Sequence, residues 1–135
     1  MITDWEETGL EREEVELFWC TLEQANGSSK KMKILLDGLT VDKLRSLVRI
    51  RDGLVSELSG RLQDEAGVLE SESTTEEYAL CMIERGRNSY LKALNDGSRT
   101  ASFESFLSSG EGLEIPLLGV LLETEEERLN TISIT

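Results

Sequence analysis

TVDKLRSLVRIRDGLVSELSGRL, residues 40–62, carries the strongest periodic signal in this chain of 135 residues. Its apolar side chains recur at spacings of three and four residues, which is the pattern of one face of an α-helix. Thr40, at its start, is of a residue type that often caps a helix N-terminus. The stretch therefore predicts a long helix that buries one side. That apolar stripe consists of Leu44, Leu47, Val48, Leu54, Val55, Leu58 and Leu62.

Helical spacing also appears on both sides of this stretch. Residues 11–25, 30–36 and 75–94 have it, and a short helix is expected near Phe103. Pro116 suits the first turn of a last helix, although the apolar run around it also fits a buried strand. We predict a mainly α, compact single-domain bundle of about four to six helices. Its core is predicted to contain Phe18, Trp19, Leu47, Leu54, Leu58, Tyr78 and Met82.

Four segments interrupt or flank these helices. Residues 1–10 are expected to form an acidic arm, and residues 63–75 and 108–112 are expected to form loops. Residues 131–135, TISIT, alternate as a short terminal strand would, and a disordered end is the alternative. Gly86 lies inside the helix predicted over 75–94, where a glycine is costly. It therefore predicts a close approach of two helices.

The charge is large and unevenly distributed. The net charge is −13, with about −7 in residues 1–29, +4 in residues 30–61 and −10 in residues 62–135. Phosphate backbones repel such a chain, so direct binding to nucleic acid is disfavoured. A basic protein partner suits the charge better, because opposite charge speeds association.

Residue types missing from the chain exclude much enzyme chemistry. It contains no histidine, the commonest general base and a common zinc ligand. No glycine-rich phosphate loop and no calcium loop is present, so we predict neither a cofactor nor a metal. Cys20 and Cys81 both lie in apolar helical patterns and are expected to be buried free thiols.

The N-terminus and the apolar runs predict a cytoplasmic protein with no membrane contact. Residues 1–16 carry seven acids and one arginine, unlike the basic start of a signal peptide. The longest apolar stretch, residues 113–122, is about half as long as the roughly 20 residues that span a bilayer.

Several short elements recur in one order within residues 11–98. They are the pair Phe18-Trp19, then Tyr78 and MIERGR at 82–87, then Tyr90 and ALND at 93–96. Together they resemble a bacterial family known as domain of unknown function 4240. The resemblance implies a bacterial or phage origin and a helical fold, and it implies no established activity.

Six residues are candidates for binding a partner. Trp5 precedes the first helical stripe among acids and is expected to be exposed. Glu13, Glu14 and Glu16 lie off the apolar face of residues 11–25. Arg85 and Arg87 suit a small anion or a partner's carboxylate, and the alternative is that Arg87 pairs with Glu84 or with a neighbouring helix.

These features favour a non-enzymatic protein that binds another protein through an acidic face. An inhibitor or immunity protein of a basic partner is the most concrete form of this hypothesis, and mimicry of nucleic acid is a related one. The alternatives are a regulatory or structural subunit of a complex and a small carboxylate-based enzyme. The oligomeric state is left open.

Overall fold

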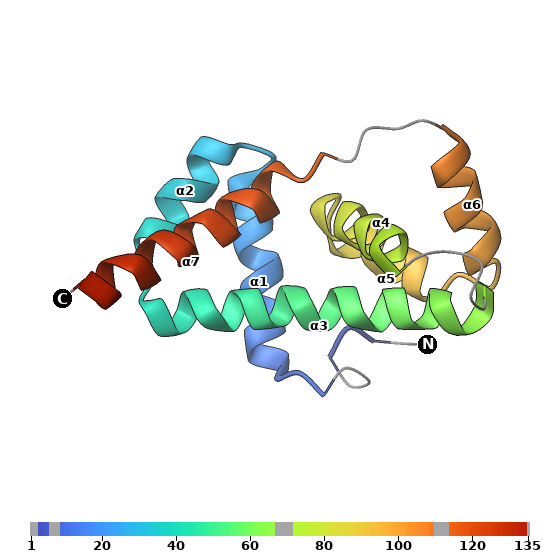
Figure 1. Cartoon of the computed structure of the whole chain (residues 1–135), viewed down its shortest axis with the longest axis horizontal. Helices are drawn as coiled ribbons and strands as arrows, with labels where there is room; N and C mark the ends of the chain where they lie inside the picture. Colours follow the sequence, from blue (N-terminus) through green and yellow to red (C-terminus); the bar gives the residue numbers. More distant parts are fainter. Residues whose placement is uncertain (1–2, 6–8, 67–71, 110–113, 135) are drawn as a thin grey trace.

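The computed structural model describes residues 3–5, 9–66, 72–109 and 114–134, and every regular element in these ranges is an α-helix (Figure 1). The mainly α prediction is therefore confirmed, with seven helices in place of four to six. They are α1 (Arg12–Ala25), α2 (Ser29–Asp37), α3 (Val41–Ala66), α4 (Glu72–Glu84), α5 (Arg87–Leu94), α6 (Arg99–Ser109) and α7 (Pro116–Ile134).

Helix α3 is the spine of the fold. It runs along the molecule with α1, α2 and α7 around its first half and with α4, α5 and α6 around its second half (Figure 1). Thr40 caps its N-terminus as predicted, because the Thr40 hydroxyl accepts a hydrogen bond from the backbone N–H of Lys43 at 3.3 Å. Because α3 contacts helices of both groups, this one helix joins them.

The buried side chains form one hydrophobic core. All seven residues predicted for it are no more than 7% exposed. Tyr90 adds a polar link inside this core, since its hydroxyl donates a hydrogen bond to the backbone carbonyl of Leu54 at 2.7 Å. Burial raises the pKa of this phenol well above its ordinary value, so it stays a donor. The bond fixes α5 against α3.

Gly86 has a different role from the one predicted. The helix expected over 75–94 is divided into α4 and α5, and Gly86 lies between them with φ +116° and ψ 170°. Residues with a side chain rarely adopt this conformation. Apart from Gly86 and its two chain neighbours, no described heavy atom lies within 4 Å of the position that a Cβ would take, so the predicted close helix approach is wrong. The break also accounts for one of the additional helices.

The two segments predicted to be loops are helical where the structure describes them, and residues 67–71 lie outside the described residues. Helix α3 continues to Ala66 and α4 begins at Glu72, so both ends of the 63–75 segment are helical. Helix α6 continues through residues 108 and 109, and the rest of the 108–112 segment lies outside the described residues. Once a helix has formed, adding a polar residue to its end costs little, so polar composition alone did not mark these ends.

The C-terminal residues are helical where their alternation predicted a strand. Helix α7 runs to Ile134, and Thr135 lies outside the described residues. An existing helix extends easily by further residues, so α7 continues through TISI, residues 131–134. An isolated strand would find no neighbouring strand among the described residues to pair with. Pro116 is the first residue of α7, as predicted.

Candidate functional site

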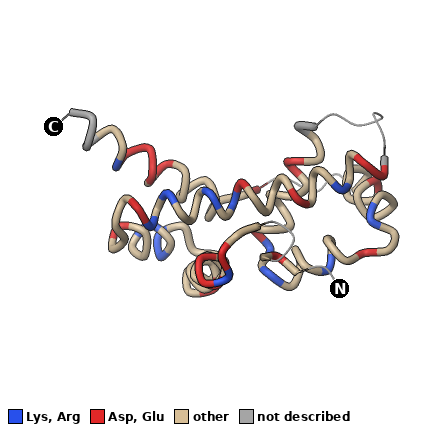
Figure 2. The backbone as a smooth tube through the Cα atoms, turned by 90° about the horizontal axis from the view of Figure 1, so that it is seen from below, with Lys and Arg blue, Asp and Glu red and all other residues tan. Residues whose placement is uncertain are grey.

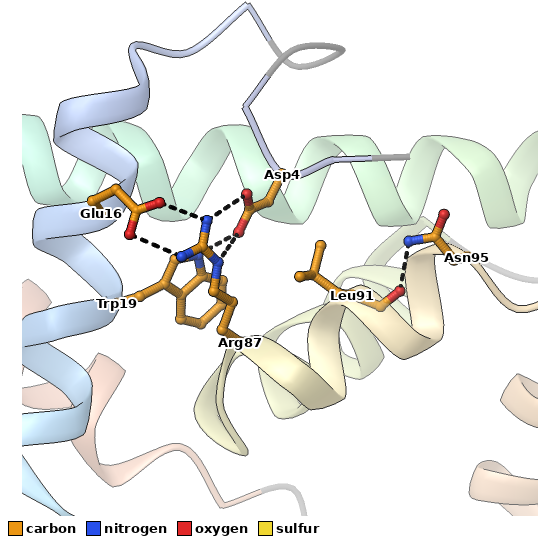
Figure 3. A network of polar contacts seen from close by, with 6 residues as sticks. All are labelled: Asp4, Glu16, Trp19, Arg87, Leu91 and Asn95. Atoms are coloured by element: carbon orange, nitrogen blue, oxygen red, sulfur yellow. Dashed lines mark hydrogen bonds and ion pairs between the residues drawn. The ribbon is translucent and has the colours of Figure 1, made fainter. Parts of the chain in front are cut away.

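Asp4, in the segment predicted to be an acidic arm, is 1% exposed. Its Oδ2 accepts hydrogen bonds from the indole nitrogen of Trp19 at 2.6 Å and from Nε of Arg87 at 2.9 Å (Figure 3). Its Oδ1 accepts a third from Nη2 of Arg87 at 3.1 Å. A buried carboxylate needs such partners, and these come from α1 and α5.

Arg87 binds a second acid in the same network. Its Nη1 and Nη2 donate to the two carboxylate oxygens of Glu16 at 2.9 and 3.0 Å, which is the bidentate geometry of a strong ion pair (Figure 3). The hydrogen bond from Arg87 lowers the pKa of Glu16, and the bond to Glu16, followed by the bond to Asp4, raises the pKa of Arg87. Arg87 therefore pairs with α1 and the N-terminal segment, and not with Glu84.

Glu84 instead caps the N-terminus of α7. Its carboxylate oxygens accept hydrogen bonds from the backbone N–H groups of Leu117 at 3.1 Å and Leu118 at 3.0 Å. Burial raises the pKa of Glu84, and these two bonds act in the opposite direction. A carboxylate at this position satisfies donors that a helix start leaves open, so it anchors α7 to α4.

Trp5 is half-buried, in contrast to the exposure predicted for it. Its ring packs against the core, and the guanidinium carbon of Arg12 lies 5.3 Å from the ring centroid. Residues 3–5 are therefore docked on the helices and do not form a free arm, while residues 6–8 lie outside the described ranges.

The three candidate acids of α1 have different surroundings. Glu14 accepts hydrogen bonds from Nη2 of Arg49 at 3.0 Å and from the hydroxyl of Ser46 at 3.2 Å. Glu16 belongs to the Arg87 network. Glu13 is exposed, and it has no ion pair with any described residue. Of the three, Glu13 is the one whose charge is directed wholly to solvent.

Arg85 lies apart from Arg87 although the two are close in sequence. Its guanidinium carbon is 5.5 Å from the ring centroid of Phe106 on α6, and the side chain is exposed. The break at Gly86 separates the two side chains. Arg87 contacts α1, whereas Arg85 contacts α6.

Helix α7 carries a group of acids that the sequence interpretation counted in the net charge but did not single out. Glu123, Glu126 and Glu127 are exposed, and their spacing of three and four residues places them on one side of the helix. Figure 2 shows this acidic run along α7. Glu127 forms an ion pair with Lys33 of α2 at 2.8 Å. The spacing of these acids was the signal that could have revealed them.

The cysteines differ in exposure. Cys81 is buried as predicted, whereas Cys20 is exposed, so that prediction is wrong. Cys20 follows Trp19 directly, and one residue further along a helix turns the side chain away from the buried face. Within the described residues, no group of three or more Cys, Asp or Glu side chains is placed to hold a metal ion.

None of the helices in the described part of the chain combines the length and the hydropathy of a bilayer span. Comparison with protein families, with curated proteins and with solved structures finds no match to this chain. The resemblance of residues 11–98 to the domain of unknown function 4240 family stays a prediction.

Proposed function

We propose that this protein is a non-enzymatic module that binds another protein with a basic surface. Its most concrete form is an inhibitor or immunity protein, and mimicry of nucleic acid is compatible with the same surface. The observation that carries the proposal is the exposed acidic side of α7, where Glu123 and Glu126 have no ion pair with any described residue. An acid that no internal cation neutralises attracts a basic partner.

Internal contacts leave few bases on α7 to neutralise its exposed acids. Arg128, the one base within the acidic run of α7, donates to the backbone carbonyls of Asp37 at 2.7 Å and Leu39 at 2.9 Å. It therefore holds α7 to the end of α2. Among the described residues, bases that form ion pairs with acids include Lys33, Arg49, Arg51, Arg61, Arg87 and Arg99.

The exposed acids of the described residues add to the field of a chain whose net charge is −13. Their summed field accelerates encounter with a basic protein and opposes encounter with a phosphate backbone. Glu13 on α1 and Glu104 on α6 are further exposed acids with no ion pair to a described residue, so the field is not confined to α7. The side of α7 differs from these single positions in having three acids together.

The two alternatives receive less support. A carboxylate enzyme requires an acid whose pKa is raised inside a cavity, but the acid in the cavity beside α5, Asp96, has its pKa lowered by hydrogen bonds from Ser102 and Ser98. A subunit of a permanent complex favours a large apolar surface. The large exposed apolar side chains of the described residues, Leu17, Ile34 and Leu107, lie on three different helices.

The test is a comparative capture from an extract of the native host cell. The immobilised wild-type protein is compared with a variant carrying Glu13→Lys, Glu123→Lys and Glu126→Lys, and each capture is eluted with increasing salt. These three acids are suitable because they have no ion pair to break, unlike Glu14 and Glu16. We expect the wild type to retain a basic protein that salt releases and that the variant does not retain.

Glu104→Lys supplies a control for reversing a single charge away from α7, because α6 lies at the opposite end of α3 from α7 (Figure 1). We expect this control to retain the same basic protein. If the wild type and the triple variant retain the same proteins at every salt concentration, the acidic surface is not a binding surface and the proposal is wrong.

A further inference from the structure

A double cavity lies where α4, α5 and α6 meet, away from the acidic side of α7. Each of its two parts has a volume of about 250 Å³, and both are lined by Tyr78, Met82, Arg85 and Ser102. These shared residues make the two parts one continuous site. Its size suits a small organic molecule.

Tyr78 is the buried polar group of this cavity. The residue is 5% exposed, and its ring packs edge-on against Phe103 and Phe106 with centroids 5.3 and 5.1 Å apart. Its hydroxyl forms no hydrogen bond with any described residue, and it is not among the fully buried side-chain atoms, so it is open to a molecule in the cavity. Burial, with the charge of Asp96 as a smaller cause, raises the pKa of the phenol, so the hydroxyl is a donor at neutral pH.

The charges around the cavity favour an anion. Its titratable lining groups are Tyr78, Arg85, Lys92 and Asp96, so two cations face one acid in a protein of net charge −13. The carboxylate of Asp96 already accepts hydrogen bonds from the backbone N–H of Ser98 at 2.8 Å and from the hydroxyl of Ser102 at 2.5 Å. Those two bonds reduce its repulsion of a second negative group.

The rest of the lining is apolar or carries hydroxyls. Met82 and Ala93 give the first part an apolar wall, and Phe106 gives one to the second part. Ser89, on α5, adds a hydroxyl that hydrogen-bonds to no described residue. A molecule that fits must therefore combine an anionic group with a compact apolar body.

We propose that this cavity binds a small organic carboxylate, with the carboxylate held by Lys92 and the Tyr78 hydroxyl and the apolar body held against Met82 and Ala93. The charge of Arg85 strengthens the attraction. This site is separate from the acidic side of α7, and the proposal does not depend on the proposed function.

The proposal is tested by titrating three small aromatic compounds of similar shape into the isotope-labelled protein and following its nuclear magnetic resonance signals. Benzoate is the anion, benzyl alcohol the neutral analogue and benzylammonium the cation. We expect benzoate to give saturable shifts of the backbone signals of Ser89, Lys92 and Ser102 at millimolar concentration. Benzyl alcohol and benzylammonium are expected to bind at least several-fold more weakly. The absence of saturable shifts with benzoate, or equal binding of all three probes, would overturn the proposal.

Two variants locate the site. Lys92→Gln removes the cation and Tyr78→Phe removes the hydroxyl while keeping the packed ring, and each is expected to weaken benzoate binding roughly three- to tenfold. Lys43→Gln makes the same charge change on an exposed residue of α3 and is the matched control. Wild-type affinity in both site variants, or an equal loss in the control, would show that this cavity does not hold the carboxylate.

Discussion

The carboxylate of Asp4 accepts a hydrogen bond from the indole nitrogen of Trp19 at 2.6 Å, inside the protein. The same carboxylate binds Arg87, so the N-terminal segment, α1 and α5 meet at one acid (Figure 3). Four of the five N–H donors of Arg87 have partners when Glu16 is included. This network and the packing of Trp5 against the core together hold residues 3–5 on the helices.

The first prediction concerns this network. Asp4→Ala removes the acceptor of the indole N–H of Trp19 and one of the two acids that Arg87 binds. Because both donors lose a buried partner, we expect the free energy of unfolding to fall by about 2–4 kcal/mol. Asp4→Asn keeps an acceptor and is expected to cost less. Urea denaturation followed by tryptophan fluorescence measures both. Glu13→Ala, at an exposed position, is the control and is expected to change stability by less than about 0.5 kcal/mol. Equal stability of Asp4→Ala and this control would contradict the account.

The second prediction concerns the cap that Glu84 places on α7. Glu84→Ala removes the acceptor of two backbone N–H groups and is expected to cost about 1–2 kcal/mol. Hydrogen exchange at the amides of Leu117 and Leu118 is expected to become faster, because the first turn of α7 opens more often. Unchanged exchange at these two amides would show that the cap does not hold the helix start.

The third prediction compares the pH dependence of two glutamates. The pKa of Glu84 is raised above its ordinary value of 4.5, so its contribution to stability falls as pH rises from that value through the folded-state pKa. The pKa of Glu16 is lowered, so its contribution is present above 4.5 and is lost as pH falls through the folded-state pKa. As pH rises, the free energy of unfolding of the wild type minus that of Glu84→Gln should therefore fall. The same difference between the wild type and Glu16→Gln should rise. Slopes of the same sign would refute this assignment.

The fourth prediction separates backbone strain from crowding at Gly86. Its φ of +116° disfavours any side chain, whereas the space around its Cβ position is empty. Gly86→Ala and Gly86→Leu are therefore expected to cost the same, about 1–3 kcal/mol. Gly60→Ala, in α3 with ordinary φ and open space, is the control and is expected to stabilise by roughly 0.4–1 kcal/mol. A much larger loss for leucine than for alanine at position 86 would restore the crowding interpretation.

Local periodicity was sufficient to predict the mainly α class and the core residues. The stripe on residues 40–62 and the apolar spacing of α1 placed Leu47, Leu54 and Trp19 in the core, because burial of an amphipathic face depends on residues three or four apart. Gly86 shows the limit of this reasoning. Whether a glycine ends a helix or lies within one depends on a backbone angle that apolar spacing does not reveal.

The candidate site was harder to predict, because its polar contacts join distant parts of the chain. Asp4 and Arg87 are 83 residues apart, and Glu14 and Arg49 are 35 apart. The sequence suggested Glu14 as a residue that binds a partner and Asp4 as part of an acidic arm, whereas the fold pairs both acids with bases. The exposed acids that have no ion pair with a described residue include Glu123 and Glu126 on α7.

The central claim, that exposed acids attract a basic partner, is tested most directly by the association rate with the captured protein as a function of salt. Raising the ionic strength from about 0.01 M to about 0.15 M shortens the Debye length from about 30 Å to about 8 Å. Stopped-flow measurement is expected to show a steep fall in the association rate and a much smaller change in the dissociation rate. At low salt, the triple variant Glu13→Lys, Glu123→Lys and Glu126→Lys should associate more slowly than Glu104→Lys. An association rate that changes neither with salt nor with reversal of these three acids would contradict the claim.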